Sequence, residues 1–158
     1  ITGSFAEVEA LLKINATFIA VDGTYRIREK QYTGPDYIKK IKKMYPKILV
    51  MADIATSQEA FACYEAGADC ISTTLCGYTP DTVFVNQEYP SFSLLEECIK
   101  FVPRDFPIMA EGRFNKPEYA AQAIENGAWA VIVGTSITRP QIITRWYVNA
   151  IKKKVGQI

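Results

Sequence analysis

Polar residues follow two short apolar runs in the second half of the sequence, at the points where each run ends. They are Glu111, Gly112 and Arg113 after the run at 108–110, and Gly134 and Thr135 after the run at 128–133. Apolar runs of this length on either side of a helical pattern are typical of buried strands. A glutamate at such a strand end is partly removed from water, which favours a role as a general acid or base.

The alternative for Glu111 is an ion pair with Arg113, which is close in sequence. Asp22 and Asp53 end two earlier apolar runs and leave the same choice open. Carboxylate oxygens accept hydrogen bonds from hydroxyl groups, so several carboxylates at neighbouring strand ends suit a hydroxyl-rich ligand such as a sugar.

A possible anion site follows the last apolar run, in the sequence GTSITRP at 134–140. The glycine-containing turn leads into a helix with proline in its first turn, so free backbone N–H groups and Arg139 could face a phosphate. In barrels of alternating strands and helices, the last two strand–helix loops commonly bind phosphate. An ordinary turn with a solvated arginine is the alternative.

The sequence contains no histidine, which excludes the Ser-His-Asp and Cys-His nucleophile systems. Its four cysteines have no CxxC spacing, and we expect reduced, mostly buried thiols. Cys76 has no activating base nearby in the sequence. Tyr78, in the long connection 75–90, could cover a sugar ring or only pack its own loop, and this connection could act as a lid.

Strand and helix patterns alternate along the whole chain. We expect strands at 17–21, 48–52, 70–72, 108–110 and 128–133, and helices at 4–15, 35–45, 56–65, around 92–99, at 115–126 with Asn115 as N-cap, and from 140 onward. This order predicts a parallel α/β sheet forming a single domain over residues 1–158. Polar residues end all five strands, which favours part of a (β/α)₈ barrel over an open doubly wound sheet.

The composition fits one globular domain, with 49% hydrophobic residues and a net charge of +1. This balance gives no general attraction to nucleic acid or to a membrane surface. No apolar run approaches the roughly 20 residues needed to span a bilayer. We therefore expect a cytoplasmic protein with a small-molecule ligand, and neither a nucleic-acid nor a membrane partner.

Four motifs together resemble one enzyme family over nearly the whole chain. They are MADIAT at 51–56, TTLCGYT at 73–79, AEGR at 110–113 and SITRPQIITRWYVNAI at 136–151. They closely resemble N-acylglucosamine-6-phosphate 2-epimerase, also called N-acetylmannosamine-6-phosphate 2-epimerase. The segment VDGTYRIR at 21–28 looks like the family's Asp-Ala-Thr segment, with Gly23 in place of alanine.

The resemblance implies a (β/α)₈ barrel isomerase that interconverts N-acetylmannosamine 6-phosphate and N-acetylglucosamine 6-phosphate in sialic acid catabolism, without a metal or organic cofactor. A lysine and a glutamate would remove and return the proton at C2. By the same resemblance, Glu111 would be the acid/base glutamate and Asp53 a ligand of sugar hydroxyls. The phosphate site would comprise Gly112, Arg113, Gly134, Thr135 and Arg139.

The sequence also departs from the family pattern. Compared with the family, it lacks the first three strand–helix units and with them the catalytic lysine, and Thr135 replaces a glycine. We therefore expect the C-terminal part of a barrel, with little activity on its own and a tendency to form homo-oligomers through its uncovered edges. Another phosphate-binding barrel enzyme and a non-catalytic sugar-phosphate-binding module are the alternatives.

Overall fold

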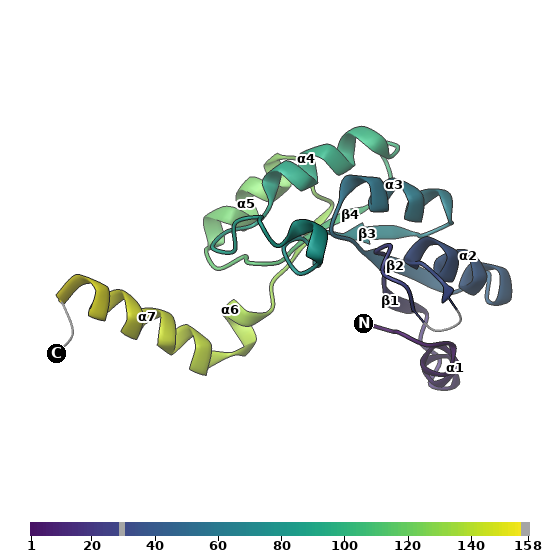
Figure 1. The fold of residues 1–158 in the computed structure, drawn as a ribbon, viewed down its shortest axis with the longest axis horizontal. Coiled ribbons are helices and arrows are strands. Elements are labelled where there is room, and N and C mark those ends of the chain that lie inside the picture. The colour runs from purple at the N-terminus through teal and green to yellow at the C-terminus, as the bar shows by residue number, and fades with distance from the viewer. Residues whose placement is uncertain (29–30, 156–158) are drawn as a thin grey trace.

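Five parallel strands form a single sheet in a computed structural model, which describes residues 1–28 and 31–155 (Figure 1). The strands are β1 (Phe18–Asp22), β2 (Leu49–Asp53), β3 (Cys70–Ser72), β4 (Ile108–Glu111) and β5 (Ala130–Ile132). They lie in the order β1-β2-β3-β4-β5, so each strand pairs with the next one in the chain. All five expected strands are present: β3 has the expected bounds, and the ends of the others are shifted by at most two residues.

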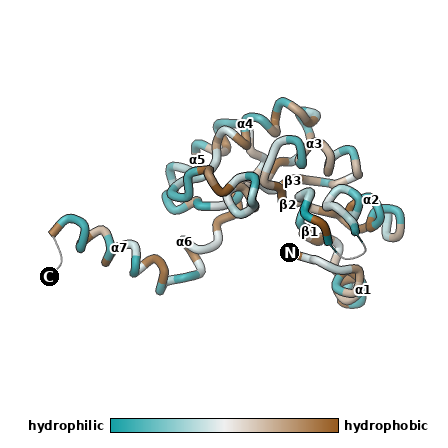
Figure 2. Tube along the Cα trace, in the orientation of Figure 1, coloured by the Kyte–Doolittle hydropathy of each residue, from teal (hydrophilic) through white to brown (hydrophobic). Residues whose placement is uncertain are grey.

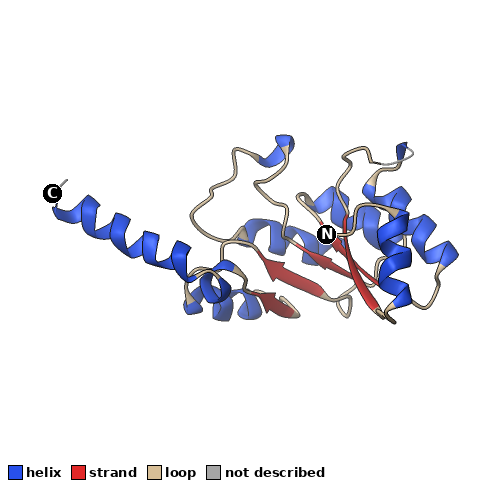
Figure 3. Ribbon diagram, turned by 90° about the horizontal axis from the view of Figure 1, so that it is seen from below, coloured by secondary structure: helices blue, strands red, loops and turns tan. Residues whose placement is uncertain are grey.

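Seven α-helices and a short 3₁₀ helix accompany these strands in the described part of the chain. They are α1 (Phe5–Lys13), α2 (Gly34–Met44), α3 (Ser57–Glu65), η2 (Pro80–Thr82), α4 (Phe92–Phe101), α5 (Pro117–Glu125), α6 (Thr135–Thr138) and α7 (Pro140–Val155). Helices α2 to α5 connect successive strands and lie along one side of the sheet, whereas α7 extends away from it (Figures 1 and 3).

The strand order decides between the two architectures considered from the sequence. A doubly wound sheet reverses its strand order at a switch point and carries helices on both faces. Here the order is sequential and the connecting helices share one face, as in one sector of a (β/α)₈ barrel. The open doubly wound alternative is therefore wrong for the described chain.

The two faces of the sheet differ in composition because side chains alternate along each strand. The face toward the helices is fully apolar at its centre, with Val21, Val50, Ala52, Ile71 and Ala110 buried in the main core. On the opposite face, the strand register aligns Ala20 with Met51, Met51 with Cys70, and Met109 with Ala130. In a (β/α)₈ barrel, the sheet face opposite the helices is the one that lines the interior.

Helix boundaries follow local capping signals closely. Ser4 with Glu7 forms a complete capping box at α1, and Thr56 with Glu59 forms another at α3. The expected N-cap at Asn115 is wrong, because Lys116 occupies that position and caps through no side-chain hydrogen bond. The Asn115 amide instead donates to the carbonyl oxygen of Glu88 at 2.9 Å.

Helix α7 differs from α1 to α5 because none of its 16 residues is buried. Hydrophobic and hydrophilic positions alternate along it, and side chains such as Tyr147 and Ile151 are exposed (Figure 2). Within residues 1–28 and 31–155, no helix is long and apolar enough to cross a membrane.

All four cysteines are buried free thiols, as expected. Burial raises the pKa of Cys70 and of Cys98 to about 12. These two thiols therefore remain protonated at neutral pH and are poor nucleophiles.

Candidate functional site

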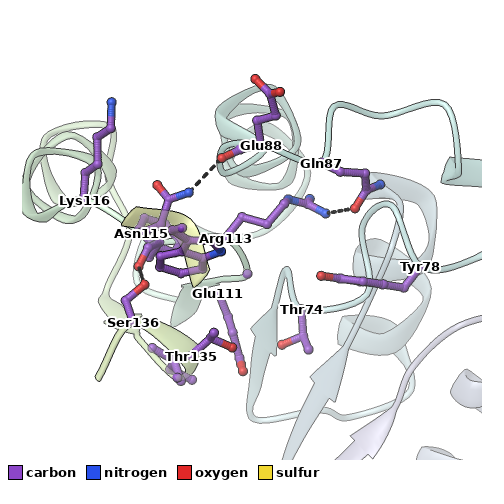
Figure 4. A pocket seen from close by; sticks show the side chains of 15 residues that line it. Thr74, Tyr78, Gln87, Glu88, Glu111, Arg113, Asn115, Lys116, Thr135 and Ser136 are labelled. Atoms are coloured by element: carbon purple, nitrogen blue, oxygen red, sulfur yellow. Dashed lines mark hydrogen bonds between the residues drawn. The ribbon is translucent and has the colours of Figure 1, made fainter. Parts of the chain in front are cut away.

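The polar residues gather at the carboxyl ends of the strands, on the face opposite the helices. The register pairs Asp22 with Asp53 and Asp53 with Ser72, and it places Glu111 beside them on β4. A pocket of about 750 Å³ opens at this edge next to Glu111, large enough for a sugar phosphate (Figure 4).

Side chains from four segments line this pocket. The lining residues are Thr74, Tyr78, Gln87, Glu88, Glu111, Gly112, Arg113, Phe114, Asn115, Lys116, Ile132, Gly134, Thr135, Ser136 and Trp146. Five of the seven site residues expected from the sequence are among them: Glu111, Gly112, Arg113, Gly134 and Thr135. The two turns that follow β4 and β5 therefore meet at one pocket, as their positions at strand ends predict.

Glu111 is held on the pocket wall by contacts with the neighbouring strand. The hydroxyl of Ser72 donates to its Oε2 atom at 2.8 Å. Its backbone N–H donates to the hydroxyl of Thr73 at 3.0 Å, and that hydroxyl donates to the Glu111 carbonyl oxygen at 2.9 Å. The carboxyl group is thus fixed in place while it remains partly exposed to the pocket.

The guanidinium group of Arg113 points away from Glu111, toward the connection at 75–90 (Figure 4). Its Nη1 atom donates to the carbonyl oxygen of Cys76 at 2.8 Å and to Oε1 of Gln87 at 3.0 Å, and its Nε atom donates to the carbonyl oxygen of Tyr89 at 3.1 Å. Its guanidinium carbon also stands 5.5 Å from the centre of the Tyr78 ring. The sequence left open an ion pair between Glu111 and Arg113. None of the ion pairs among the described residues joins these two side chains.

These contacts make Arg113 the anchor of the long connection. Gly112 and Arg113 both have positive φ, at 102° and 62°, a conformation that is unfavourable for arginine. The three hydrogen bonds to the loop offset this cost, since bonds to a charged donor contribute about 1.5–3 kcal/mol each. The connection is therefore a fixed wall of the pocket in this structure.

Arg113→Ala is expected to loosen the connection without unfolding the sheet. Loss of the guanidinium contacts should speed amide hydrogen exchange at residues 76–89 by about 10- to 100-fold, equivalent to about 1.4–2.7 kcal/mol. Hydrogen exchange followed by mass spectrometry measures this directly. Arg104→Ala, at an exposed arginine outside the pocket, is the matched control. Unchanged exchange in Arg113→Ala would contradict the anchoring role.

Asp53 lies behind the pocket lining rather than on it, with only 3% of its surface exposed. Burial, the neighbouring Glu111 and, more weakly, Asp22 raise its pKa to about 7. Its Oδ1 atom has no hydrogen-bond partner among the described residues. A buried carboxyl oxygen without a donor is costly, which makes this atom a candidate acceptor for a group supplied from outside the described chain.

Asp22 forms an ion-paired cluster at the end of β1. Arg26 and Arg28 each approach its carboxyl group at 2.7 Å, and the Thr24 hydroxyl donates to it at 2.6 Å. Burial alone would raise the pKa of Asp22, but the Thr24 hydrogen bonds and the two arginines outweigh it and lower the pKa. Asp22 is thus an ionised structural residue, and the ion-pair interpretation applies to this carboxylate.

Arg139 is absent from the lining of the pocket, although Gly134 and Thr135 belong to it. The segment expected to be one turn before a helix instead forms α6, and Arg139 is the C-cap residue of α6 at the junction with α7. Arg139 is exposed at this junction and does not line the pocket, although Trp146, further along α7, does. Helix direction after a turn is set by tertiary packing, which local sequence patterns do not report.

Several pocket residues were not expected from the sequence. Lys116 lines the pocket, with its ammonium group 5.4 Å from the centre of the Tyr119 ring. Ser136 donates to the carbonyl oxygen of Phe114 at 2.9 Å and so joins the two turns. The run NKP before α5 resembles an ordinary helix start, and only the pairing of β4 with β5 brings it to the pocket. Within the described chain, no group of three His, Cys, Asp or Glu residues could hold a metal ion.

Comparison with known proteins identifies relatives along almost the whole chain. A family model described as "Putative N-acetylmannosamine-6-phosphate epimerase" matches residues 1–153. Two proteins named "Putative N-acetylmannosamine-6-phosphate 2-epimerase" are 44% identical over 98% of this chain (Caldanaerobacter subterraneus subsp. tengcongensis) and 40% identical over 96% of it (Shouchella clausii).

A solved structure of the N-acetylmannosamine-6-phosphate 2-epimerase from Clostridium perfringens is also similar. It superimposes with a TM-score of 0.84 at 39% identity, over 95% of this chain and 63% of that chain. The match covers 63% and 66% of the two sequence relatives. The chain therefore spans just under two thirds of the length of these proteins.

Proposed function

The chain belongs to the N-acetylmannosamine-6-phosphate epimerase family, and on this basis we propose that it supplies the acid/base carboxyl group and the sugar-phosphate pocket of such an enzyme. The reaction interconverts N-acetylmannosamine 6-phosphate and N-acetylglucosamine 6-phosphate. The observation that supports it most is the position of Glu111, fixed by Ser72 on the wall of a 750 Å³ pocket.

Epimerisation at C2 needs a proton to leave one face of the carbon and return on the other. The C2 proton becomes acidic in the open-chain sugar because C1 is then a carbonyl group, which delocalises the negative charge. A carboxylate within reach of C2 serves as base in one direction and, once protonated, as acid in the other. We assign this role to Glu111.

As the resemblance to the family implies, we propose a lysine as the second acid/base group, on the other face of C2. None of the five described strands ends in a lysine. In our proposal that lysine comes from a part of the barrel outside this sequence, and the five strand–helix units correspond to the C-terminal part of the barrel. The chain by itself should then have little or no activity.

The phosphate group is proposed to bind where the turns after β4 and β5 meet. Gly112 and Gly134 expose backbone there, Thr135 adds a hydroxyl group, and Arg113 and Lys116 supply two positive charges, which offset those of Glu88 and Glu111 in the same lining. Arg139 joins this site only if α6 and α7 turn back toward the sheet. The unpartnered Oδ1 atom of Asp53 supports the proposal that it accepts a hydrogen bond from the sugar or from the missing lysine.

We also propose that copies of this chain associate through α7. Its exposed apolar residues have no cover in the described chain, and the outer edge of β5 pairs with no other described strand. Apolar helix faces and open strand edges are both surfaces on which proteins associate. Light scattering on the purified chain should give a mass above that of one copy; a monomer would contradict this.

The experiment for the reaction is incubation with N-acetylmannosamine 6-phosphate. Proton NMR monitors the conversion, because the proton on C1 gives a separate signal in each of the two epimers. The protein with all eight strand–helix units, of which this sequence is a part in our proposal, should convert this sugar phosphate. It should leave other phosphorylated sugars unchanged. Conversion of a different sugar phosphate would indicate another phosphate-binding barrel enzyme. Binding without conversion, by the protein with all eight strand–helix units, would indicate a non-catalytic module and would contradict the proposed function.

A further inference from the structure

Two hydroxyl groups lie beside the carboxyl group of Glu111 and are joined to it by hydrogen bonds. Ser72 donates to Oε2 of Glu111 at 2.8 Å, and the hydroxyls of Ser72 and Thr74 are 2.5 Å apart. Ser72 is fully buried, whereas Thr74 is partly exposed and lines the pocket together with Glu111 (Figure 4). Of the two hydroxyl groups, a ligand in the pocket can therefore reach that of Thr74.

Each hydroxyl has a single proton to donate, which determines the order of the donors. When Glu111 is ionised, as it must be to act as a base, the proton of Ser72 points to Oε2. Two hydroxyl oxygens at 2.5 Å need a proton between them, and only Thr74 can then supply it. The Thr74 hydroxyl thus gives its proton to Ser72 and presents only lone pairs to the pocket.

Asp53 is the other acceptor near Thr74. The Thr74 hydroxyl has only the weakest of the influences on the pKa of Asp53, and no hydrogen bond among the described residues joins the two side chains. A Thr74 proton turned toward Asp53 would leave the oxygens of Ser72 and Thr74 facing each other at 2.5 Å without a proton, which is repulsive. The contact with Ser72 therefore decides the direction.

The same order holds after Glu111 has taken a proton. Oε2 already accepts from Ser72, and none of the hydrogen bonds within residues 1–28 and 31–155 involves Oε1. Oε1 is then the oxygen that takes the proton from C2, while Ser72 continues to donate to Oε2. Thr74 remains an acceptor toward the pocket in both forms of Glu111.

We infer that the Thr74 hydroxyl determines specificity as an acceptor, which binds a hydrogen-bond donor on C2 or C3 of the sugar. This inference rests on the proposed function, which places C2 beside Glu111. Thr74 is two hydrogen bonds away from that carboxyl group, so it reaches groups on C2 or on a neighbouring carbon. In the open-chain sugar C1 is a carbonyl group and only accepts, which leaves the N–H of the acetamido group and the 3-hydroxyl as donors.

An acceptor at this position also excludes ligand groups. The C1 carbonyl, the acetyl carbonyl and the phosphate carry lone pairs on their oxygens, and Thr74 would repel them. Thr74 therefore determines which side of the sugar faces β3, while the proposed phosphate site lies at the turns after β4 and β5. Ser72 is a positioning residue in this arrangement, because it acts on the ligand only through Thr74 and Glu111.

The test is the affinity of the protein with all eight strand–helix units for N-acetylmannosamine 6-phosphate, measured by isothermal titration calorimetry. Thr74→Val keeps the shape of the side chain but leaves the ligand donor unpaired, so the dissociation constant should rise about 10-fold. Thr74→Ser keeps the hydroxyl group, and its dissociation constant should stay within about twofold of the original. Ser72 can still donate to Glu111 in both variants.

The 3-deoxy analogue of the sugar phosphate identifies the donor. If Thr74→Val loses as much affinity for the analogue as for the parent sugar, the donor is the acetamido N–H; if it loses none, the donor is the 3-hydroxyl. Both results support the inference. An unchanged dissociation constant for the parent sugar in Thr74→Val would overturn it, as would an equally large loss in Thr74→Ser.

Neutron diffraction from crystals of the unsubstituted protein is a second test that needs neither a variant nor a ligand. With Glu111 ionised, the Thr74 proton should lie between Thr74 and Ser72, and a proton directed into the pocket or toward Asp53 would overturn the inference. Neither test depends on turnover. Binding that depends on Thr74 without conversion of the sugar would retain the inference and reject the proposed function, and conversion with an affinity that does not depend on Thr74 would do the opposite.

Discussion

Glu111→Gln is expected to lower the rate of proton exchange at C2 of N-acetylmannosamine 6-phosphate by about 10³-fold, measured in the protein with all eight strand–helix units. Glutamine keeps the length of the side chain and can still accept the hydrogen bond that Ser72 gives to Glu111. It cannot take or return a proton. The loss should therefore appear in kcat, with KM changed much less.

The matched control is Glu125→Gln, which removes an exposed carboxylate at the end of α5 outside the pocket. Its exchange rate should equal that of the unsubstituted protein. A Glu111→Gln variant that retains more than about a tenth of the original kcat would exclude Glu111 as the acid/base group, since general acid–base catalysis contributes about 10²–10⁴-fold.

Asp53→Asn is expected to stabilise the folded protein at pH 8 and to have little such effect at pH 4. The pKa of Asp53 rises from 3.8 to about 7 on folding, so the folded state holds its proton more tightly than the unfolded state does. The stability linked to this proton is complete below about pH 4 and is lost as the pH rises through 7. Asparagine does not ionise and avoids that loss.

The size of this effect follows from the difference between the two pKa values. Each unit corresponds to about 1.36 kcal/mol, so the gain at pH 8 should be about 2–4 kcal/mol relative to pH 4. Urea unfolding of both proteins at the two pH values measures it, and comparing pH values removes any constant cost of the amide group. Asp105→Asn, at an exposed loop residue, should give no pH-dependent gain. An equal Asp53→Asn effect at pH 4 and pH 8 would contradict a buried, protonated Asp53.

Local sequence patterns predicted most of the fold because the signals concerned are local. The capping boxes at Ser4 and Thr56 formed as their spacing requires, and Gly67 and Gly127 end α3 and α5 with positive φ. The capping residue Glu59 has a further role that spacing cannot reveal. Its carboxylate also accepts from the backbone N–H of Tyr25, in the connection after β1, and Glu59 is buried.

The sequence predicted only those residues of the candidate site that lie directly at the carboxyl ends of strands. Glu111, Gly112, Gly134 and Thr135 meet because parallel neighbours bring their carboxyl ends to one edge. The roles of charged residues beyond the strands depend on where loops and helices go. Arg113 binds the 75–90 connection and Arg139 lies exposed at the C-cap of α6, and no short motif encodes either position.

The central claim is that Glu111 is the acid/base group at C2. The most direct test is incubation of the protein with all eight strand–helix units with N-acetylmannosamine 6-phosphate in deuterated water. With Glu111 as acid/base at C2, deuterium should enter at C2 of both epimers as they equilibrate, and Glu111→Gln should stop both processes together. Equilibration with no deuterium at C2, or deuterium entry that continues unchanged in Glu111→Gln, would contradict the account.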